Sequence, residues 1–102
     1  MTLADLPIQF DSDEIAGFCS DRGIRRLAFF GSVLRDDFSQ ASDVDMLVEY
    51  LPGRHPGLML FRHQHELATR FKRTVDLHTP ASLSIYFRDK ILAHSLPIYE
   101  RP

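Results

Sequence analysis

The sequence of 102 residues contains one cysteine, Cys19, and no long apolar run. A single cysteine excludes an internal disulfide and is typical of a reducing compartment. No run approaches the roughly 20 apolar residues that a membrane-spanning helix needs. The first ten residues lack the basic start and the long apolar centre of a secretory signal. We therefore expect a cytoplasmic, soluble protein that does not interact with membranes.

The chain also lacks a strong excess of charge, since its formal net charge is −2. This value argues against a nonspecific coat on nucleic acid, although it permits a local basic patch. The two basic clusters contain a single aromatic residue, Phe71, and so lack the series of interleaved aromatic residues that a groove for single strands would require. We interpret the clusters as solvated faces and do not expect nucleic-acid binding. They are Arg22, Arg25 and Arg26, and Arg70, Lys72 and Arg73.

Repeats, low-complexity segments and linkers are absent from the sequence. A chain of this length fits one domain. Its hydrophobic content of 44% and charged content of 25% are ordinary for a globular protein. We expect a single domain over residues 1–102, with room for one modest core.

The first half of the chain predicts a helix and two strands. Asp11 and Glu14 have the spacing of a capping box, and Gly23 suits a helix end, so we expect a helix over about residues 12–22. Strands are expected over residues 24–30 and about 44–50. The link between them is too short for a crossover helix, so these strands should pair antiparallel. Residues 33 to about 37 should form one or two helical turns.

The second half predicts a helix over residues 58–71, a strand over 74–78 and a final helix. The connection through a full helix permits the third strand to pair parallel with the second. Thr79 and Pro80 suit the start of the last helix, and Pro97 should stop it and leave residues 98–100 as a tail. The apolar stripes expected to be buried are Leu60, Gln64, Leu67 and Phe71 with Phe61 and Ala68, and Leu83, Tyr86, Phe87, Ile91 and Leu92.

The residues with the clearest chemistry lie around the first two strands. Gly31 and Ser32 end the first strand in a tight turn whose backbone N–H groups suit a phosphate. Asp43 and Asp45 begin the second strand, and alternation along a strand puts both on the same side. Paired carboxylates favour a divalent cation, and Mg²⁺ in turn favours phosphate. The pattern indicates metal-dependent chemistry on a nucleotide.

The five histidines form no zinc-binding spacing that we recognise. His63 and His65 are two residues apart on a predicted helix, so they face different directions and do not chelate together. Asp76 stands between two apolar residues of the third strand. Burying a lone carboxylate at this position costs folding free energy unless the group is exposed to solvent or paired.

The spacing of Gly31 and Ser32, ten further residues, and then Asp43-Val44-Asp45 resembles the signature of the polymerase-β-like nucleotidyltransferase superfamily. Arg35 and Ser42 also resemble its small stand-alone members, the minimal nucleotidyltransferases, and Val75 to Thr79 (VDLHT) looks like the segment that carries their third carboxylate. The resemblance implies an α/β (α+β) polymerase-β-type fold with a small mixed sheet of three to four strands flanked by helices.

The same resemblance implies roles for six residues. Asp43, Asp45 and Asp76 would be catalytic and would hold two Mg²⁺ ions, with Asp45 bridging them. Gly31, Ser32 and Arg35 would bind the phosphates of ATP. Ser42 is expected to orient the loop through a bond to the backbone.

Small proteins of this type commonly form the antitoxin half of a prokaryotic pair with a HEPN ribonuclease toxin. The resemblance implies that the antitoxin transfers AMP from ATP to a tyrosine of the toxin, as a homodimer or in a hetero-oligomer with the toxin. Two alternatives stay open. One is a non-catalytic antitoxin that acts by complex formation, and the other, weaker one is an antibiotic nucleotidyltransferase.

Overall fold

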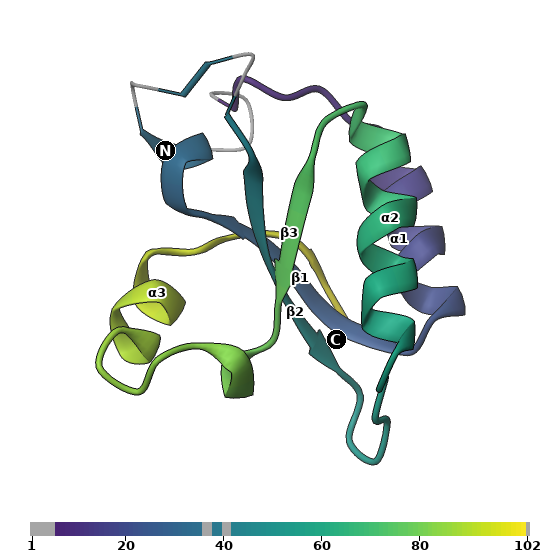
Figure 1. Cartoon of the computed structure of the whole chain (residues 1–102). Coiled ribbons are helices and arrows are strands. Elements are labelled where there is room, and N and C mark those ends of the chain that lie inside the picture. The colour runs from purple at the N-terminus through teal and green to yellow at the C-terminus, as the bar shows by residue number, and fades with distance from the viewer. Residues whose placement is uncertain (1–5, 36–37, 40–41, 102) are drawn as a thin grey trace.

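The computed structural model describes residues 6–35, 38–39 and 42–101. Three α-helices, two short 3₁₀-helices and four strands follow one another along the chain (Figure 1). In order they are α1 (Ser12–Asp21), β1 (Ile24–Phe30), η2 (Gly31–Leu34), β2 (Val44–Tyr50), α2 (Met59–Phe71), β3 (Val75–His78), η3 (Pro80–Ser82), α3 (Arg88–His94) and β4 (Leu96–Glu100).

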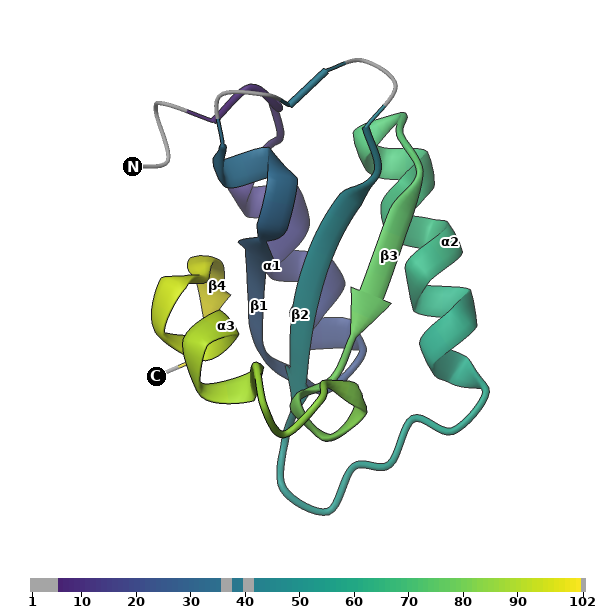
Figure 2. The ribbon, with the colours of Figure 1, turned by 60° about the vertical axis from the view of Figure 1, so that its left-hand side comes forward.

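The four strands form one mixed sheet in the order β3-β2-β1-β4. β1 pairs antiparallel with both β2 and β4, whereas β2 and β3 run parallel (Figure 2). The predicted antiparallel and parallel pairings are therefore confirmed, as is the mixed sheet of the expected fold class. Because β1 ends where β2 begins, the Gly31 turn and the start of β2 lie at the same end of the sheet.

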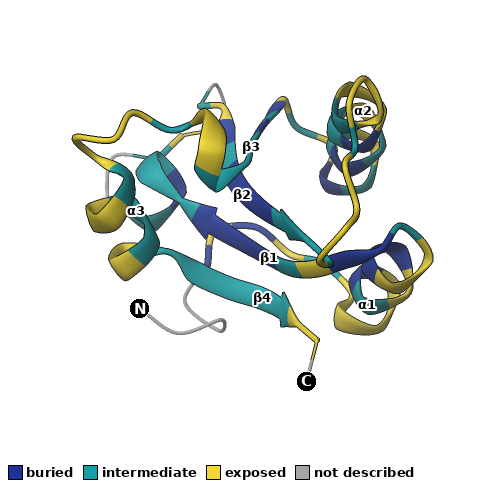
Figure 3. Cartoon of the chain, turned by 90° about the horizontal axis from the view of Figure 1, so that it is seen from below, coloured by how far each residue is buried: buried dark blue, intermediate teal, exposed yellow. Residues whose placement is uncertain are grey.

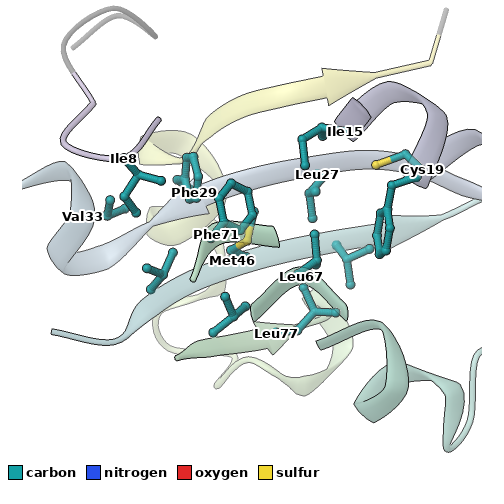
Figure 4. Packing of buried hydrophobic residues seen from close by; sticks show 14 of the residues in the cluster. Ile8, Ile15, Cys19, Leu27, Phe29, Val33, Met46, Leu67, Phe71 and Leu77 are labelled. Atoms are coloured by element: carbon teal, nitrogen blue, oxygen red, sulfur yellow. The ribbon is translucent and has the colours of Figure 1, made fainter. Parts of the chain in front are cut away.

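Helices α1 and α2 cover one side of the sheet, and α3 lies on the other side (Figure 3). The core forms between the sheet and the helix pair, where Phe29 and Phe71 meet edge to face with ring centroids 5.6 Å apart. Met46 and Leu67 converge on the same space (Figure 4). Burial of apolar side chains contributes about 1.5–3 kcal/mol each, so this layer supplies most of the stability.

Helix α1 begins where its sequence predicts. The carboxylate of Asp11 accepts hydrogen bonds from the backbone N–H groups of Asp13 and Glu14, at 2.9 and 3.3 Å. An N-cap of this kind stabilises a helix by about 1 kcal/mol. The segment before it is irregular over residues 6–11 and adds Leu6 and Ile8 to the core.

Helix α2 confirms the predicted range to within one residue but buries a different face in part. Leu67 and Phe71 are buried as expected, whereas Phe61 is 62% exposed and His63 is buried instead. The imidazole Nδ1 of His63 lies 2.7 Å from the hydroxyl of Tyr50. The side-chain oxygen of Gln64 accepts a hydrogen bond of 2.8 Å from the backbone N–H of Leu77 on the edge strand β3.

The prediction for residues 79–100 is wrong in two respects. Thr79 and Pro80 begin the short η3 rather than a long helix, and α3 forms only from Arg88 to His94. Tyr86 and Phe87, which were expected on a buried face, are 85% and 60% exposed and lie before the start of α3.

The predicted C-terminal tail is a strand. Pro97 lies within β4 opposite Ala28, and a proline is tolerated there because β4 is an edge strand. The helical turns predicted over residues 33–37 are η2, Gly31–Leu34, although Asp36 and Asp37 lie outside the described residues.

None of the described helices has both the length and the apolar character needed to cross a membrane.

Candidate active site

The candidate site forms at the end of the sheet where β1 ends and β2 begins. Phe30, the last residue of β1, pairs with Asp45 of β2. The hydroxyl of Ser32 donates a hydrogen bond of 3.3 Å to the backbone carbonyl of Asp43. The structure therefore brings the Gly31 turn beside the two carboxylate residues, although the segment between them is ten residues long.

Gly31 approaches Asp45 so closely that a side chain would not fit. Its φ is +75°, and a Cβ added there would lie 2.7 Å from the Oδ2 atom of Asp45. Glycine is favoured at this position both by the left-handed backbone and by the contact. The turn and the carboxylate are thus held against each other by the backbone.

Asp76 lies next to Asp45 on the neighbouring strand. The two residues are register partners in the parallel pair of β2 and β3, so their side chains lie on the same face of the sheet. Both are partly buried. Their neighbours Val44, Met46 and Val75 are buried toward α1 and α2, which leaves the two carboxylates on the opposite face.

The electrostatics of the site concentrate on Asp45. Burial raises the pKa of Asp45, the charge of His78 opposes that rise, and the negative charges of Asp76 and Asp43 add to it. The Nε2 atom of His78 lies 3.8 Å from Oδ1 of Asp45. Arg35 also lowers the pKa of Asp45, to a smaller extent. The three carboxylates therefore share one electrostatic environment in which negative charge is in excess.

The chemistry of this donor set fits Mg²⁺, which takes oxygen ligands and is bound through carboxylates and phosphates. A bound cation would also relieve the repulsion that raises the pKa of Asp45. Across residues 6–35, 38–39 and 42–101, however, no three His, Cys, Asp or Glu side chains are grouped closely enough to hold a metal ion as they stand. The same result gives no support to a zinc site among the histidines.

The loop before Asp43 is fixed from two directions. The hydroxyl of Ser42 accepts a hydrogen bond of 3.0 Å from the backbone N–H of Ser39, which confirms its predicted bond to the backbone. The guanidinium of Arg73 donates to the carbonyls of Ser39 and Ser42 and stacks over the ring of Phe38. Arg73 was predicted as part of a solvated cluster, and no pattern in the sequence indicated this contact.

Other arginines of the two basic clusters also make local pairs. Arg22 pairs with Glu66 at 2.7 Å, and Arg25 and Arg26 both pair with Glu49, at 2.6 and 3.2 Å. The side chains of Arg22 and Arg26 are only 20% and 17% exposed, so these two arginines are less solvated than predicted and help to hold the fold together.

His78 is the residue at the site that sequence reasoning missed. Strand alternation could have found it, because His78 follows Asp76 by two residues and therefore points to the same side. The ring of Phe30 packs edge to face against it, with centroids 5.5 Å apart. His78 thus lies between the end of β1 and the carboxylates.

A family model described as "Polymerase beta, Nucleotidyltransferase" matches residues 13–102. The chain is also 33% identical over 76 residues to "Putative protein adenylyltransferase MJ0435" of Methanocaldococcus jannaschii, which covers 74% of this chain and 81% of that protein.

Solved structures share the fold. One, described as "Structure of putative minimal nucleotidyltransferase", has a TM-score of 0.70 and 28% identity and covers 84% of this chain and 87% of that one. A second, "Crystal structure of the toxin-antitoxin with AMP-PNP", has a TM-score of 0.71 at 17% identity, with 90% and 75% covered. A third, of the toxin-antitoxin MntA-HepT, has a TM-score of 0.63 at 16% identity, with 88% and 70% covered. At such low identities the last two show likeness of fold alone.

Proposed function

Because the chain belongs to the polymerase β nucleotidyltransferase family, and is therefore a nucleotidyltransferase, we propose that it transfers AMP from ATP to a protein hydroxyl. The acceptor is a tyrosine of a cognate HEPN ribonuclease toxin, and the transfer silences that toxin. The chain acts as the antitoxin of the pair.

The observation that carries this proposal is the meeting of Gly31, Asp45 and Asp76 at one end of the sheet. A Cβ added at Gly31 would lie 2.7 Å from the Oδ2 atom of Asp45, and Asp76 is the register partner of Asp45. Phosphate-binding backbone and cation-binding side chains are the two requirements of nucleotidyl transfer.

The proposed roles divide the six residues into two groups. Asp43, Asp45 and Asp76 hold Mg²⁺, which when bound offsets charge on the phosphates and lowers the pKa of the attacking hydroxyl. The backbone N–H groups at Gly31 and the hydroxyl of Ser32 bind phosphate oxygens.

Arg35 steadies the triphosphate from the end of the same turn. The acceptor oxygen bonds to the α-phosphorus, the bond to pyrophosphate breaks, and the hydroxyl proton leaves to solvent. The carboxylates hold the reactants, and the Gly31 turn holds the leaving group.

A protein acceptor is supported by the relatives and by the surface of the chain. The curated relative is named as a protein adenylyltransferase, and the solved relatives include toxin–antitoxin complexes. Residues 85–87 present three large apolar side chains, exposed by 71%, 85% and 60%. Contiguous exposed apolar residues are typical of protein contact sites.

The test is incubation of the chain with Mg²⁺, the cognate toxin and ATP labelled at the α-phosphate. Labelled toxin, with an increase in intact mass equal to a whole number of AMP groups, is the expected result. Wild-type chain that labels no toxin under these conditions would overturn the proposal.

The alternative of an antitoxin that acts by binding alone is favoured by the same exposed residues 85–87. The double variant Asp43→Ala and Asp45→Ala separates the two functions. If this variant still neutralises the toxin at the wild-type level of expression, catalysis is not the mechanism.

A further inference from the structure

A hollow of about 750 Å³ lies between the phosphate turn and α3. Figures 1 and 2 both show η2 and α3 on the same side of the sheet, one beyond the other along β1. Such a volume is within the range of small-molecule sites. The lining comes from both elements and from the start of β4: Phe30, Gly31, Leu34 and Arg35, and Lys90, Ile91, Ala93, His94, Ser95 and Leu96.

The charge of this lining has one sign. Among the described residues that line it, Arg35, Lys90 and His94 are the titratable ones, and none is Asp or Glu. The chain as a whole carries a net charge of −2, so the positive charge of this lining does not follow from the overall composition. Apolar walls between the cations exclude water and strengthen their attraction for an anion.

The two cationic side chains of α3 act from the same side of their helix. Lys90 and His94 are four residues apart, which brings their side chains together on one helical face. Both are exposed, and across the described residues Lys90 forms no ion pair. Facing them across the hollow is Gly31, whose backbone begins the turn.

We propose that Lys90 and His94 are a second arm of the nucleotide site and bind the phosphate oxygens of the nucleotide opposite the Gly31 turn. This inference rests on the proposed function, since it adds binding residues to the same substrate. The phosphates then lie between backbone N–H groups on one wall and two cationic or neutral N–H donors on the other. The apolar walls support the stems of these side chains.

The experiment is calorimetric titration of the chain with inorganic tripolyphosphate and, separately, with AMP-PNP, both in Mg²⁺. Lys90→Gln should raise both dissociation constants about tenfold, because one charge-assisted hydrogen bond is lost. His94→Asn should raise them severalfold, and Lys90→Arg should retain most of the affinity.

Lys72→Gln is the matched control. It removes the same charge from a residue that lines a different hollow, together with Gln64 and Thr74. It should leave both dissociation constants within about twofold of wild type, because an exposed charge at a distance is screened. Lys90 and His94 are exposed, so thermal unfolding of their variants should match wild type.

Each result has a defined consequence. Wild-type chain that binds neither ligand overturns the proposed function itself. Wild-type binding that is unchanged in Lys90→Gln and His94→Asn overturns the inference alone. An equal loss in Lys72→Gln also overturns it, because the effect would then be general charge. A loss for AMP-PNP without a loss for tripolyphosphate overturns the assignment to the phosphates and indicates a nucleoside contact.

Discussion

Replacing Gly31 with alanine should destabilise the chain and disable the site through one atom. The substitution adds a Cβ at a φ of +75°, a conformation that costs an L-residue about 1–2 kcal/mol. That Cβ would also lie 2.7 Å from Oδ2 of Asp45, closer than such atoms approach in proteins. Relief of the overlap requires the Asp45 carboxylate, which is the end of a partly exposed side chain, to rotate from its position, at a further cost of about 0.5–1.5 kcal/mol.

Gly53→Ala is the control for backbone strain. Gly53 has a φ of +81°, and a Cβ added there meets nothing within 4 Å. It should therefore lose about 1–2 kcal/mol of unfolding free energy, whereas Gly31→Ala should lose about 1.5–3.5 kcal/mol. For a chain of this size each kcal/mol lowers the unfolding midpoint by about 4–8 °C, so calorimetry resolves the difference.

A double-mutant cycle isolates the contact between Gly31 and Asp45. In the Asp45→Ala background the remaining close atom is the Cβ of residue 45, at an ordinary 3.5 Å, so Gly31→Ala should cost no more than Gly53→Ala. The nucleotidyl-transfer rate should fall with Gly31→Ala and stay near wild type with Gly53→Ala. Equal destabilisation by the two alanines, with transfer retained in both, would refute the reasoning.

Asp45→Asn should raise the unfolding midpoint at neutral pH, because burial and nearby carboxylates raise the pKa of Asp45 and make its ionised form unfavourable in the fold. The gain should vanish below the unfolded pKa of about 3.9, where both states are protonated, and a gain that persists there would contradict this origin. Tyr50→Phe should cost about 1–2 kcal/mol in urea unfolding by removing the 2.7 Å contact to buried His63, while Tyr86→Phe, at an exposed position, should cost nothing measurable. Serine at all three of residues 85–87 should abolish labelling of the toxin and leave AMP-PNP affinity unchanged; labelling at the wild-type rate would exclude this surface from toxin contact.

The sheet and the candidate site could be predicted because their information is local in the sequence. The apolar runs that end at Phe30 and begin at Val44 define β1 and β2, and the short link between them excludes a crossover. Alternation along each strand then fixes which side chains share a face. The pairing of Asp45 with Asp76 follows once β3 is placed parallel to β2.

Residues 79–100 could not be predicted because their structure depends on what covers each face. A helical stripe containing Tyr86 and Phe87 looks buried in sequence, yet the described structure leaves both exposed. Pro97 normally interrupts regular structure, but an edge strand has one side without a partner and accepts it. Burial and edge position are tertiary properties that periodicity does not encode.

Sequence reasoning missed Lys90, His94 and Arg73 for the same reason, whereas strand alternation could have found His78. Lys90 and His94 lie more than 50 residues from Gly31 in the chain and line the same hollow. Arg73 reaches the loop before Asp43 through the parallel pairing of β2 and β3. Segments that are far apart in the sequence come into contact only when the sheet forms, so the spacing of residues in a motif does not predict these contacts.

The bond between Gln64 and Leu77 has a consequence for how the molecule meets its neighbours. The unpaired backbone N–H groups of an edge strand can pair with a strand of another molecule and so extend the sheet. Strand β3, which contains Asp76, is an edge strand of this kind. The side-chain oxygen of Gln64, on α2, accepts a hydrogen bond from the backbone N–H of Leu77 at this edge. Because this N–H is already bonded within the chain, it cannot pair with a further strand, and extension of the sheet beside Asp76 is disfavoured.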